Sequence, residues 1–144
     1  MRFWDSSALI PLCVEELQSE PIRSLMREDA EQAVWWAASV ECSSSFARIR
    51  REGGITPESE QLLRLTLARL AEYWTEIAPS EEVRTTARRL LLRHPLRAAD
   101  SLQLAAALVW SGNQPEELGF VCLDNRLREA ARAEGFVLHP ATMG

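Results

Sequence analysis

MRFWDSSALI, residues 1–10, is the stretch that decides the fold. An apolar run ends at the carboxylate of Asp5, and the hydroxyls of Ser6 and Ser7 follow before the chain becomes apolar again. This order predicts a short buried strand with an aspartate at its carboxyl end, where open α/β sheets bind their ligands. Capping the following helix is the other ordinary role of an aspartate placed between a strand and a helix.

The composition is that of an ordinary globular protein, with 47% hydrophobic and 26% charged residues in 144. A chain of this length is expected to form one domain, residues 1–144, without needing disulfides. No apolar run is long enough to span a membrane, and the N-terminus does not resemble a signal peptide because Asp5 interrupts it. The three cysteines are widely spaced, so we expect them to be reduced in a cytoplasmic protein.

The charge pattern excludes several functions. A net charge of −5 argues against a protein that coats nucleic acid non-specifically, although it permits a nucleic-acid enzyme that uses a few local arginines. All 16 residues of the lysine and arginine class are arginine. The absence of lysine excludes a P-loop NTPase. It also disfavours the receiver domains and haloacid-dehalogenase phosphatases, which pair a strand-end aspartate with a lysine.

Strand and helix patterns alternate along the chain. Beyond the first strand, strands are expected at 33–38, 75–78, 119–124 and 136–140. Helices are expected at 6–17 with a break at Pro11, at 19–31, from a cap at Ser39 to Gly53, and at 58–73, 79–94, 96–112 and 125–135. This order predicts an α/β fold in which helices cover both faces of a parallel sheet.

The helix after Ser39 and the helix at 58–73 are predicted to pair as an antiparallel hairpin. Their apolar residues recur at helical spacing, as Cys42, Phe46 and Ile49 in the first helix and as Leu63, Leu67, Leu70 and Trp74 in and after the second.

Four acidic residues fall where this fold would bring them together. Asp5 and Asp124 each follow a strand, and Glu41 and Asp100 lie in the first turns of helices. Taken singly, each has a structural explanation, as a helix cap or as a favourable charge at a helix N-terminus. Taken together, all four are expected at the carboxyl edge of the sheet.

Four converging carboxylates would repel one another and raise one another's pKa unless a cation neutralised them. Oxygen ligands in that number suit Mg²⁺ or Mn²⁺. Such a site can hydrolyse a phosphodiester, because the metal activates water and stabilises the transition state. The predicted metal and catalytic residues are therefore Asp5, Glu41, Asp100 and Asp124, with Ser6, Ser7 and Asn125 as polar helpers that hold metal-bound waters.

The motifs carrying these acids resemble those of the PIN-domain family, and specifically the VapC-type toxins of bacterial toxin–antitoxin pairs. They are DSSAL at Asp5, the helical Glu41, LRAADSLQLAAAL at Asp100 and FVCLDNRLREAARAEGF at Asp124. The resemblance implies a three-layer α/β/α sandwich with a protruding helical hairpin. It also implies a Mg²⁺- or Mn²⁺-dependent endoribonuclease that cuts single-stranded RNA, forms a homodimer and is inhibited by a small cognate antitoxin.

One position departs from the family pattern. Cys122 stands where the family often has a threonine, two residues before the last aspartate, which makes Asp124 the least secure of the four acids. Two other functions stay open: a catalytically inactive, PIN-like module that binds a protein partner, and a housekeeping nuclease for RNA processing.

Arginines flank the acidic residues in the sequence. They could contact RNA phosphates or could form solvated helix faces, and the sequence favours neither interpretation. The residues concerned are Arg48, Arg50, Arg51, Arg97, Arg126 and Arg128. His94 and His139 share no ligand spacing, so neither is expected to bind a metal.

Overall fold

The computed structural model describes residues 1–143 and confirms the predicted order of strands and helices. The elements are β1 (Arg2–Trp4), α1 (Ser6–Cys13), α2 (Ser19–Glu28), β2 (Gln32–Trp35), α3 (Ala38–Arg51), α4 (Pro57–Ala71), β3 (Thr75–Ile77), α5 (Glu81–Arg93), α6 (Ala98–Trp110), β4 (Gly119–Val121), α7 (Asn125–Glu134) and β5 (Val137–His139). None of the helices among residues 1–143 combines the length and apolar character that crossing a membrane requires.

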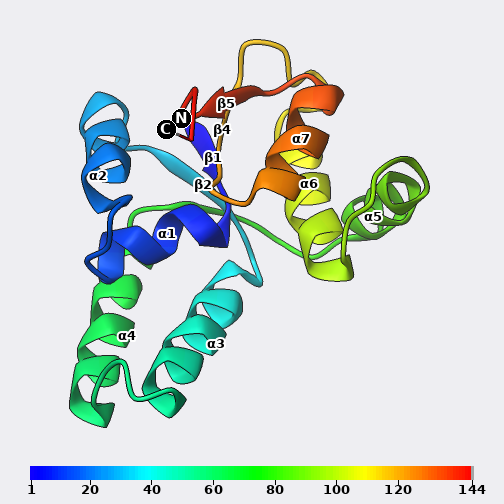
Figure 1. The fold of residues 1–144 in the computed structure, drawn as a ribbon. Helices are drawn as coiled ribbons and strands as arrows, with labels where there is room; N and C mark the ends of the chain where they lie inside the picture. Colours follow the sequence, from blue (N-terminus) through cyan, green and yellow to red (C-terminus); the bar gives the residue numbers. More distant parts are fainter. Residues whose placement is uncertain (144) are drawn as a thin grey trace.

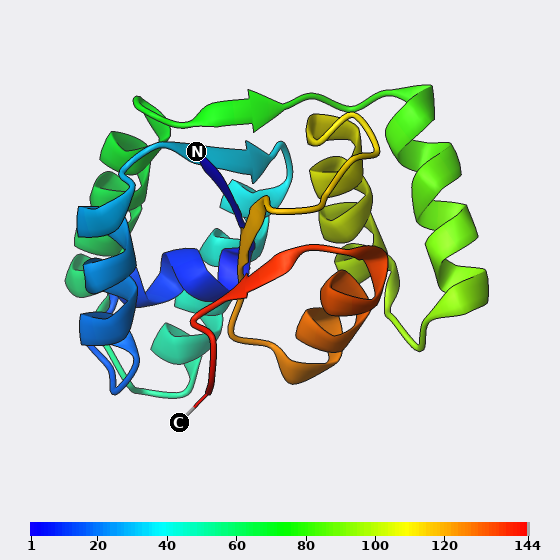
Figure 2. The ribbon, with the colours of Figure 1, turned by 90° about the horizontal axis from the view of Figure 1, so that it is seen from above.

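The five strands form one parallel sheet in the order β3-β2-β1-β4-β5. The first strand of the chain is thus the middle strand, as Figure 2 shows. The chain winds outward from β1 through β2 to β3, then crosses to the other side of β1 for β4 and β5. The strand order therefore reverses between β1 and β4, and ligand sites in open α/β sheets lie outside the carboxyl ends of such a pair.

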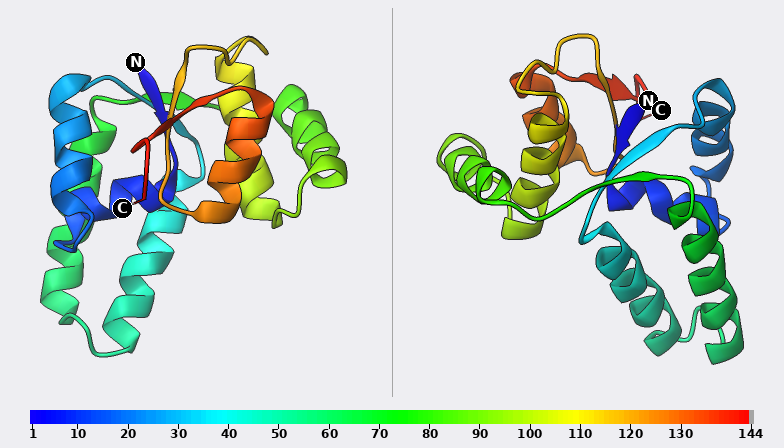
Figure 3. Two further views of the ribbon diagram at one scale, coloured as in Figure 1. Left: turned by 45° about the horizontal axis from the view of Figure 1, so that its top comes forward. Right: turned by 180° about the vertical axis from the view of Figure 1, so that it is seen from behind.

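Alternate residues of each strand point to opposite faces of the sheet and divide the core in two. Phe3 and Phe120 pack with α5, α6 and α7, whereas Trp4 and Val121 pack with α1, α2, α3 and α4. The two helical layers are visible on either side of the strands in Figure 3. These layers confirm the predicted α/β/α sandwich.

The predicted hairpin is formed by α3 and α4, which extend together away from the sheet (Figure 1). An ion pair from Arg50 of α3 to Glu60 of α4 joins the two helices, and Arg64, also on α4, pairs with the same carboxylate. Thr56 caps α4 by accepting a hydrogen bond from the Ser59 backbone N–H.

Several predicted boundaries are wrong by a few residues. Pro11 lies inside α1 and does not break it; its missing N–H removes one helical hydrogen bond, the one to the carbonyl of Ser7. Ser39 is not the cap of α3, since the carbonyl of Ala37 already accepts hydrogen bonds from the backbone N–H groups of Val40 and Glu41. The strand predicted at 119–124 ends at Val121, and Ile49 is half-buried rather than buried.

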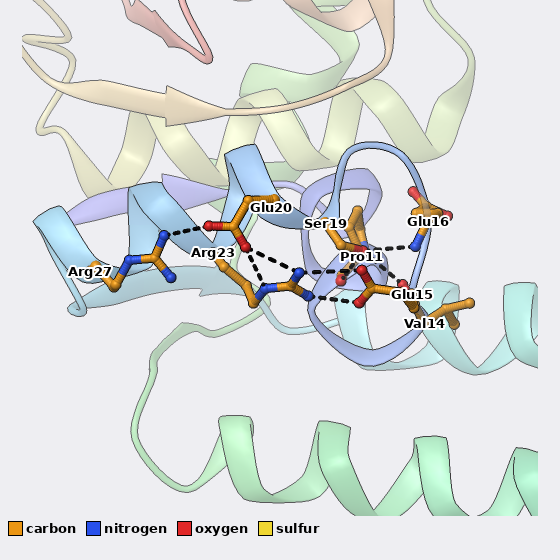
Figure 4. Close-up of polar contacts among 8 residues, drawn as sticks. All are labelled: Pro11, Val14, Glu15, Glu16, Ser19, Glu20, Arg23 and Arg27. Atoms are coloured by element: carbon orange, nitrogen blue, oxygen red, sulfur yellow. Dashed lines mark hydrogen bonds and ion pairs between the residues drawn. The ribbon is translucent and has the colours of Figure 1, made fainter.

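The α1–α2 corner, residues 11–27, connects the first two helices through a dense polar network (Figure 4). Ser19 is fully buried, and its hydroxyl lies 2.8 Å from the carbonyl oxygen of Pro11 and 3.1 Å from that of Val14. The same hydroxyl accepts a hydrogen bond from the backbone N–H of Glu16. Ser19 thus satisfies carbonyl groups that the end of α1 leaves without helical partners.

Four of the charged side chains at the surface of this corner are also paired. Arg23 donates two hydrogen bonds to Glu15 and forms an ion pair with Glu20, which in turn pairs with Arg27 (Figure 4).

Candidate functional site

An open cleft of about 1080 Å³ lies where α1, α3, α6 and α7 begin, at the carboxyl edge of the sheet. We call it the acidic cleft. Its polar lining consists of Ser6, Glu41, Ser44, Ser45, Arg48, Arg97, Asp100, Asp124, Asn125 and Arg126. One cavity is therefore lined by three of the four predicted acids. Two of the predicted polar helpers, Ser6 and Asn125, line it too.

Asp5 lies beneath this lining, only 4% exposed, at the carboxyl end of β1. Its carboxylate caps α1 by accepting hydrogen bonds from the backbone N–H and hydroxyl of Ser7, so the structural role considered for it is present. Burial raises its pKa to about 6, and the neighbouring Glu41 carboxylate adds to the rise, although Ser7 opposes it. Asp5 is thus a capping residue that carries an unfavourable buried charge.

Glu41 is held in place from two other elements. The hydroxyl of Ser6 lies 2.9 Å from Glu41 Oε1, and the side-chain amide of Gln103 donates to the same oxygen over 3.2 Å. Burial raises the pKa of Glu41 and the Asp100 carboxylate raises it further, while the two hydrogen bonds lower it.

Gln103 was not among the predicted site residues. It lies three positions after Asp100 and is fully buried, and its Oε1 atom has no hydrogen-bond partner among residues 1–143. A polar residue in the otherwise apolar run LQLAAAL is the sequence signal that could have identified it.

Asp100 and Asp124 complete the acidic lining. Asp124 caps α7 by accepting a hydrogen bond of 3.0 Å from the backbone N–H of Arg126. Burial raises the pKa of Asp100, and the Asp124 carboxylate adds to the rise, while Arg97 and Arg126 oppose it.

The four acids therefore form a row of electrostatic neighbours, in which Asp5 interacts with Glu41, Glu41 with Asp100, and Asp100 with Asp124. Within residues 1–143 none of them forms an ion pair with an arginine. Nor does any group of three or more His, Cys, Asp or Glu side chains in that range lie close enough to enclose a metal ion directly. The acids are adjacent, but they do not form a closed cage.

Cys122 connects two of the acids. Its buried Sγ lies 3.5 Å from Asp5 Oδ2 and accepts a hydrogen bond of 3.4 Å from the backbone N–H of Asp124. Burial raises the pKa of this thiol far above its ordinary value, so it stays protonated and can donate to Asp5. The thiol thus occupies a position in which a hydroxyl could make similar contacts.

Five of the six flanking arginines divide into two groups, and Arg51 is exposed outside the cleft. Arg48, Arg97 and Arg126 line the acidic cleft and are exposed. Arg128 is buried and donates to the carbonyl oxygens of Cys122 and Pro140, so it has a structural role. Arg50 also has a structural role, in the hairpin.

The histidines lie outside the acidic cleft. His94 forms a 2.6 Å contact with Glu134 between the end of α5 and α7, and His139 belongs to β5.

Comparisons with known proteins establish the fold of the chain. No protein-family model matches the sequence, and no curated protein matches it. Among solved structures, the crystal structure of FitAcB from Neisseria gonorrhoeae is similar, with a TM-score of 0.66 over 94% of this chain and 96% of that one. Only 14% of the aligned residues are identical. The likeness confirms the predicted PIN-like fold class.

Proposed function

We propose that the protein is a Mg²⁺- or Mn²⁺-dependent endoribonuclease that cuts single-stranded or loop RNA and acts as the toxin of a toxin–antitoxin pair, as VapC-type proteins do. One observation carries the enzymatic part of this proposal: a row of four carboxylates at the point where the strand order reverses, none of them paired with an arginine among residues 1–143. Such an arrangement is costly to the folded protein unless a cation binds there.

The residues present fit a hydrated magnesium or manganese ion. All the donors are hard oxygens, and three of the acids, Asp5, Glu41 and Asp100, have a raised pKa. Mg²⁺ keeps several of its waters, so it does not need three carboxylates in direct contact. In this proposal Asp5 and Asp100 hold the ion, Glu41 and Asp124 complete its acidic surroundings, and the unpartnered Oε1 of Gln103 accepts a hydrogen bond from a water.

Such an ion lowers the pKa of a bound water and neutralises charge that develops on the phosphate during hydrolysis. The protein's own contribution is to keep its carboxylates ionised and oriented. Ser7 and Cys122 donate to Asp5, while Ser6 and Gln103 donate to Glu41. Hydrogen bonds to an ionised carboxylate favour the charged form, which is the form that binds a cation. Ser6 and Asn125, which face the cavity, can also hold waters.

The experiment that tests the enzyme is cleavage of a labelled single-stranded RNA with Mg²⁺ or Mn²⁺ and with EDTA. Activity is expected only with metal, and Asp100→Asn is expected to lower it by about 100-fold or more, a loss typical of removing one electrostatic group from an active site. Asp29→Asn is the matched control, because Asp29 lies outside the acidic cleft and pairs with the N-terminus. Full activity in EDTA, or in a folded Asp100→Asn variant, would contradict the proposal.

The biological part of the proposal rests on the sequence motifs and is supported by the PIN-like fold. It includes a homodimer, a small antitoxin encoded beside this gene, and action in the cytoplasm. Expression of the protein alone is expected to arrest growth, and co-expression of the neighbouring small reading frame to relieve the arrest. If the Asp100→Asn variant also arrested growth, toxicity would not depend on the proposed nuclease activity.

A second candidate is an inactive PIN-like module in which the acidic cleft receives a basic side chain of a protein partner. The absence of three closely grouped acids among residues 1–143 favours it. Calorimetric titration with Mn²⁺ distinguishes the two: binding that is lost in Asp100→Asn supports the enzyme, and no binding at millimolar metal supports the module.

A further inference from the structure

Three arginines line the acidic cleft without forming ion pairs with its carboxylates among residues 1–143. Arg48 lies on α3, Arg97 is the residue that precedes α6, and Arg126 lies in the first turn of α7. All three are exposed, and none forms an ion pair within residues 1–143. We call them the arginine rim.

The rim arginines belong to the half of the chain's 16 arginines that form no ion pair within residues 1–143, and they differ from the others of that half in lining the cleft. Eight other arginines each form at least one ion pair with an acidic side chain in the same range. Arg97 and Arg126 are close enough to Asp100 to affect its charge, and yet they do not pair with it. Their guanidinium groups therefore remain free to bind an anion from outside the protein.

Backbone groups at the same place also favour an anion. Helices α6 and α7 both begin at the cleft, and a helix N-terminus carries a partial positive charge, although Asp124 already accepts one N–H of α7. Arg97, which occupies the cap position of α6, makes no side-chain capping hydrogen bond. The hydroxyls of Ser44 and Ser45 line the cleft on the same helix as Arg48 and add further donors.

We infer that Arg48, Arg97 and Arg126 bind backbone phosphates of single-stranded RNA on either side of the phosphate that reaches the acidic residues. The inference rests on the proposed function and adds its substrate contacts. A guanidinium group can donate two parallel hydrogen bonds to a phosphate, which makes arginine well suited to this task.

The surroundings favour a nucleic-acid strand over an acidic peptide. A strand offers phosphates for the arginines and a central phosphate that a cation can link to the carboxylates, so one ligand matches both kinds of group. An acidic peptide matches only the arginines. The net charge of −5 repels any polyanion at a distance, so local contacts must supply the attraction.

The test is RNA binding measured without cleavage, by fluorescence anisotropy of a labelled single-stranded RNA oligonucleotide in EDTA over a range of salt concentrations. Arg48→Gln, Arg97→Gln and Arg126→Gln are each expected to weaken binding several-fold. Each is also expected to reduce the slope of log K against log salt by about 0.7, the contribution of one phosphate contact to a single strand.

The matched control is Arg88→Gln. Arg88 lies on α5, is exposed, forms no ion pair within residues 1–143 and lies outside the acidic cleft. The variant makes the same change in net charge, and it is expected to bind RNA like the unaltered protein. A rim of phosphate contacts also predicts that the rim variants raise KM for cleavage in Mn²⁺ and leave kcat nearly unchanged.

Several results would overturn the arginine rim. The rim variants could bind RNA as tightly as the unaltered protein, or Arg88→Gln could weaken binding as much as they do. The unaltered protein could fail to bind RNA in either EDTA or Mn²⁺, or poly-glutamate could compete for binding as strongly as unlabelled RNA. The last would assign the rim to an acidic polypeptide. If the protein binds RNA through the rim but never cleaves it, the rim stands and the nuclease fails. If it cleaves RNA and the rim variants are unaltered in KM, the nuclease stands and the rim fails.

Discussion

The two ends of α1 differ in whether their buried polar groups have neutralising partners. At its C-terminal end, in the α1–α2 corner, the buried Ser19 hydroxyl shares its hydrogen between the carbonyl oxygens of Pro11 and Val14 and accepts one from Glu16 N–H, and most surface charges are paired. At its N-terminal end, Asp5 is buried beside another carboxylate, Glu41, and neither forms an ion pair within residues 1–143.

The difference indicates that the polar groups of the α1–α2 corner stabilise the fold, whereas those of the acidic cleft do not. A buried polar group stabilises a fold only when its partners are present, and a buried charge without a counter-ion destabilises it. The corner satisfies this rule and the acidic cleft does not. The folded protein retains this cost at one end of α1, whereas at the other end the buried hydroxyl has its partners and most surface charges are paired. This difference indicates that the acidic end binds a ligand.

The largest expected loss of stability comes from removing the hydroxyl of Ser19, the central group of the corner. Ser19→Ala leaves the carbonyls of Pro11 and Val14 and the N–H of Glu16 without their partner, which is expected to lower the free energy of unfolding by about 2–3 kcal/mol. Urea denaturation measures it. Ser111→Ala is a suitable control, since that hydroxyl makes one hydrogen bond and is half-buried. An equal loss in both variants would remove the special role of the corner.

At the N-terminal end of α1, removing a polar group is expected to raise the free energy of unfolding. The pKa of Asp5 rises from 3.8 to about 6 on folding, so its ionisation costs stability, and that cost appears as the pH rises between these values. Asp5→Asn removes the charge and is expected to stabilise the metal-free protein by up to about 3 kcal/mol above pH 6, with the gain shrinking towards pH 4.

Denaturation of both proteins in EDTA at several pH values measures this gain. Asp29→Asn serves as the control, because it breaks an ion pair with the N-terminus and should stabilise at no pH. A metal-free Asp5→Asn variant that is less stable than the unaltered protein at pH 8 would mean that the carboxylate acts only as a helix cap.

A smaller effect is expected from metal. Mn²⁺ at ten times its dissociation constant should stabilise the protein by about 1.4 kcal/mol through mass action alone. This gain should disappear in Asp100→Asn and persist in Asp29→Asn. It should also weaken as the pH falls through about 6, because a proton on Asp5 competes with the cation. Thermal denaturation measures it, and equal stabilisation of the Asp100→Asn variant would place the metal elsewhere.

The sequence was sufficient for the fold because its signals are local and repeated. Every strand except β3 contains a short apolar run, and the helices have their own apolar spacing. The alternation of the two allows few arrangements other than a parallel sheet. The shared location of the acids followed from the same reasoning, since helices after parallel strands begin at one edge. Asp100 and Asp124 line the cavity as that reasoning predicts, and Asp5 lies just beneath it.

Contacts between side chains far apart in the sequence could not be predicted from the sequence. Nothing local distinguishes Arg126, which is exposed at the cleft, from Arg128, which is buried against two carbonyl groups, because the difference depends on how α7 packs against β4 and β5. Gln103 was overlooked for the same reason, since its partner Glu41 is 62 residues away. The cap of α3 was misplaced because the chain turns immediately after β2, before Ser39 is reached.

The smallest effect is expected from the surface charges of the corner. Arg23→Gln removes the contacts with Glu15 and Glu20, but these groups are exposed, and water and salt already screen their attraction. We expect the urea midpoint to stay within experimental error of the unaltered protein and to respond little to added salt. If Arg23→Gln instead cost as much stability as Ser19→Ala, the corner would depend on its ion pairs. Pairing of surface charges would then matter to the fold, and the unpaired arginines of the rim would need a structural explanation before a functional one.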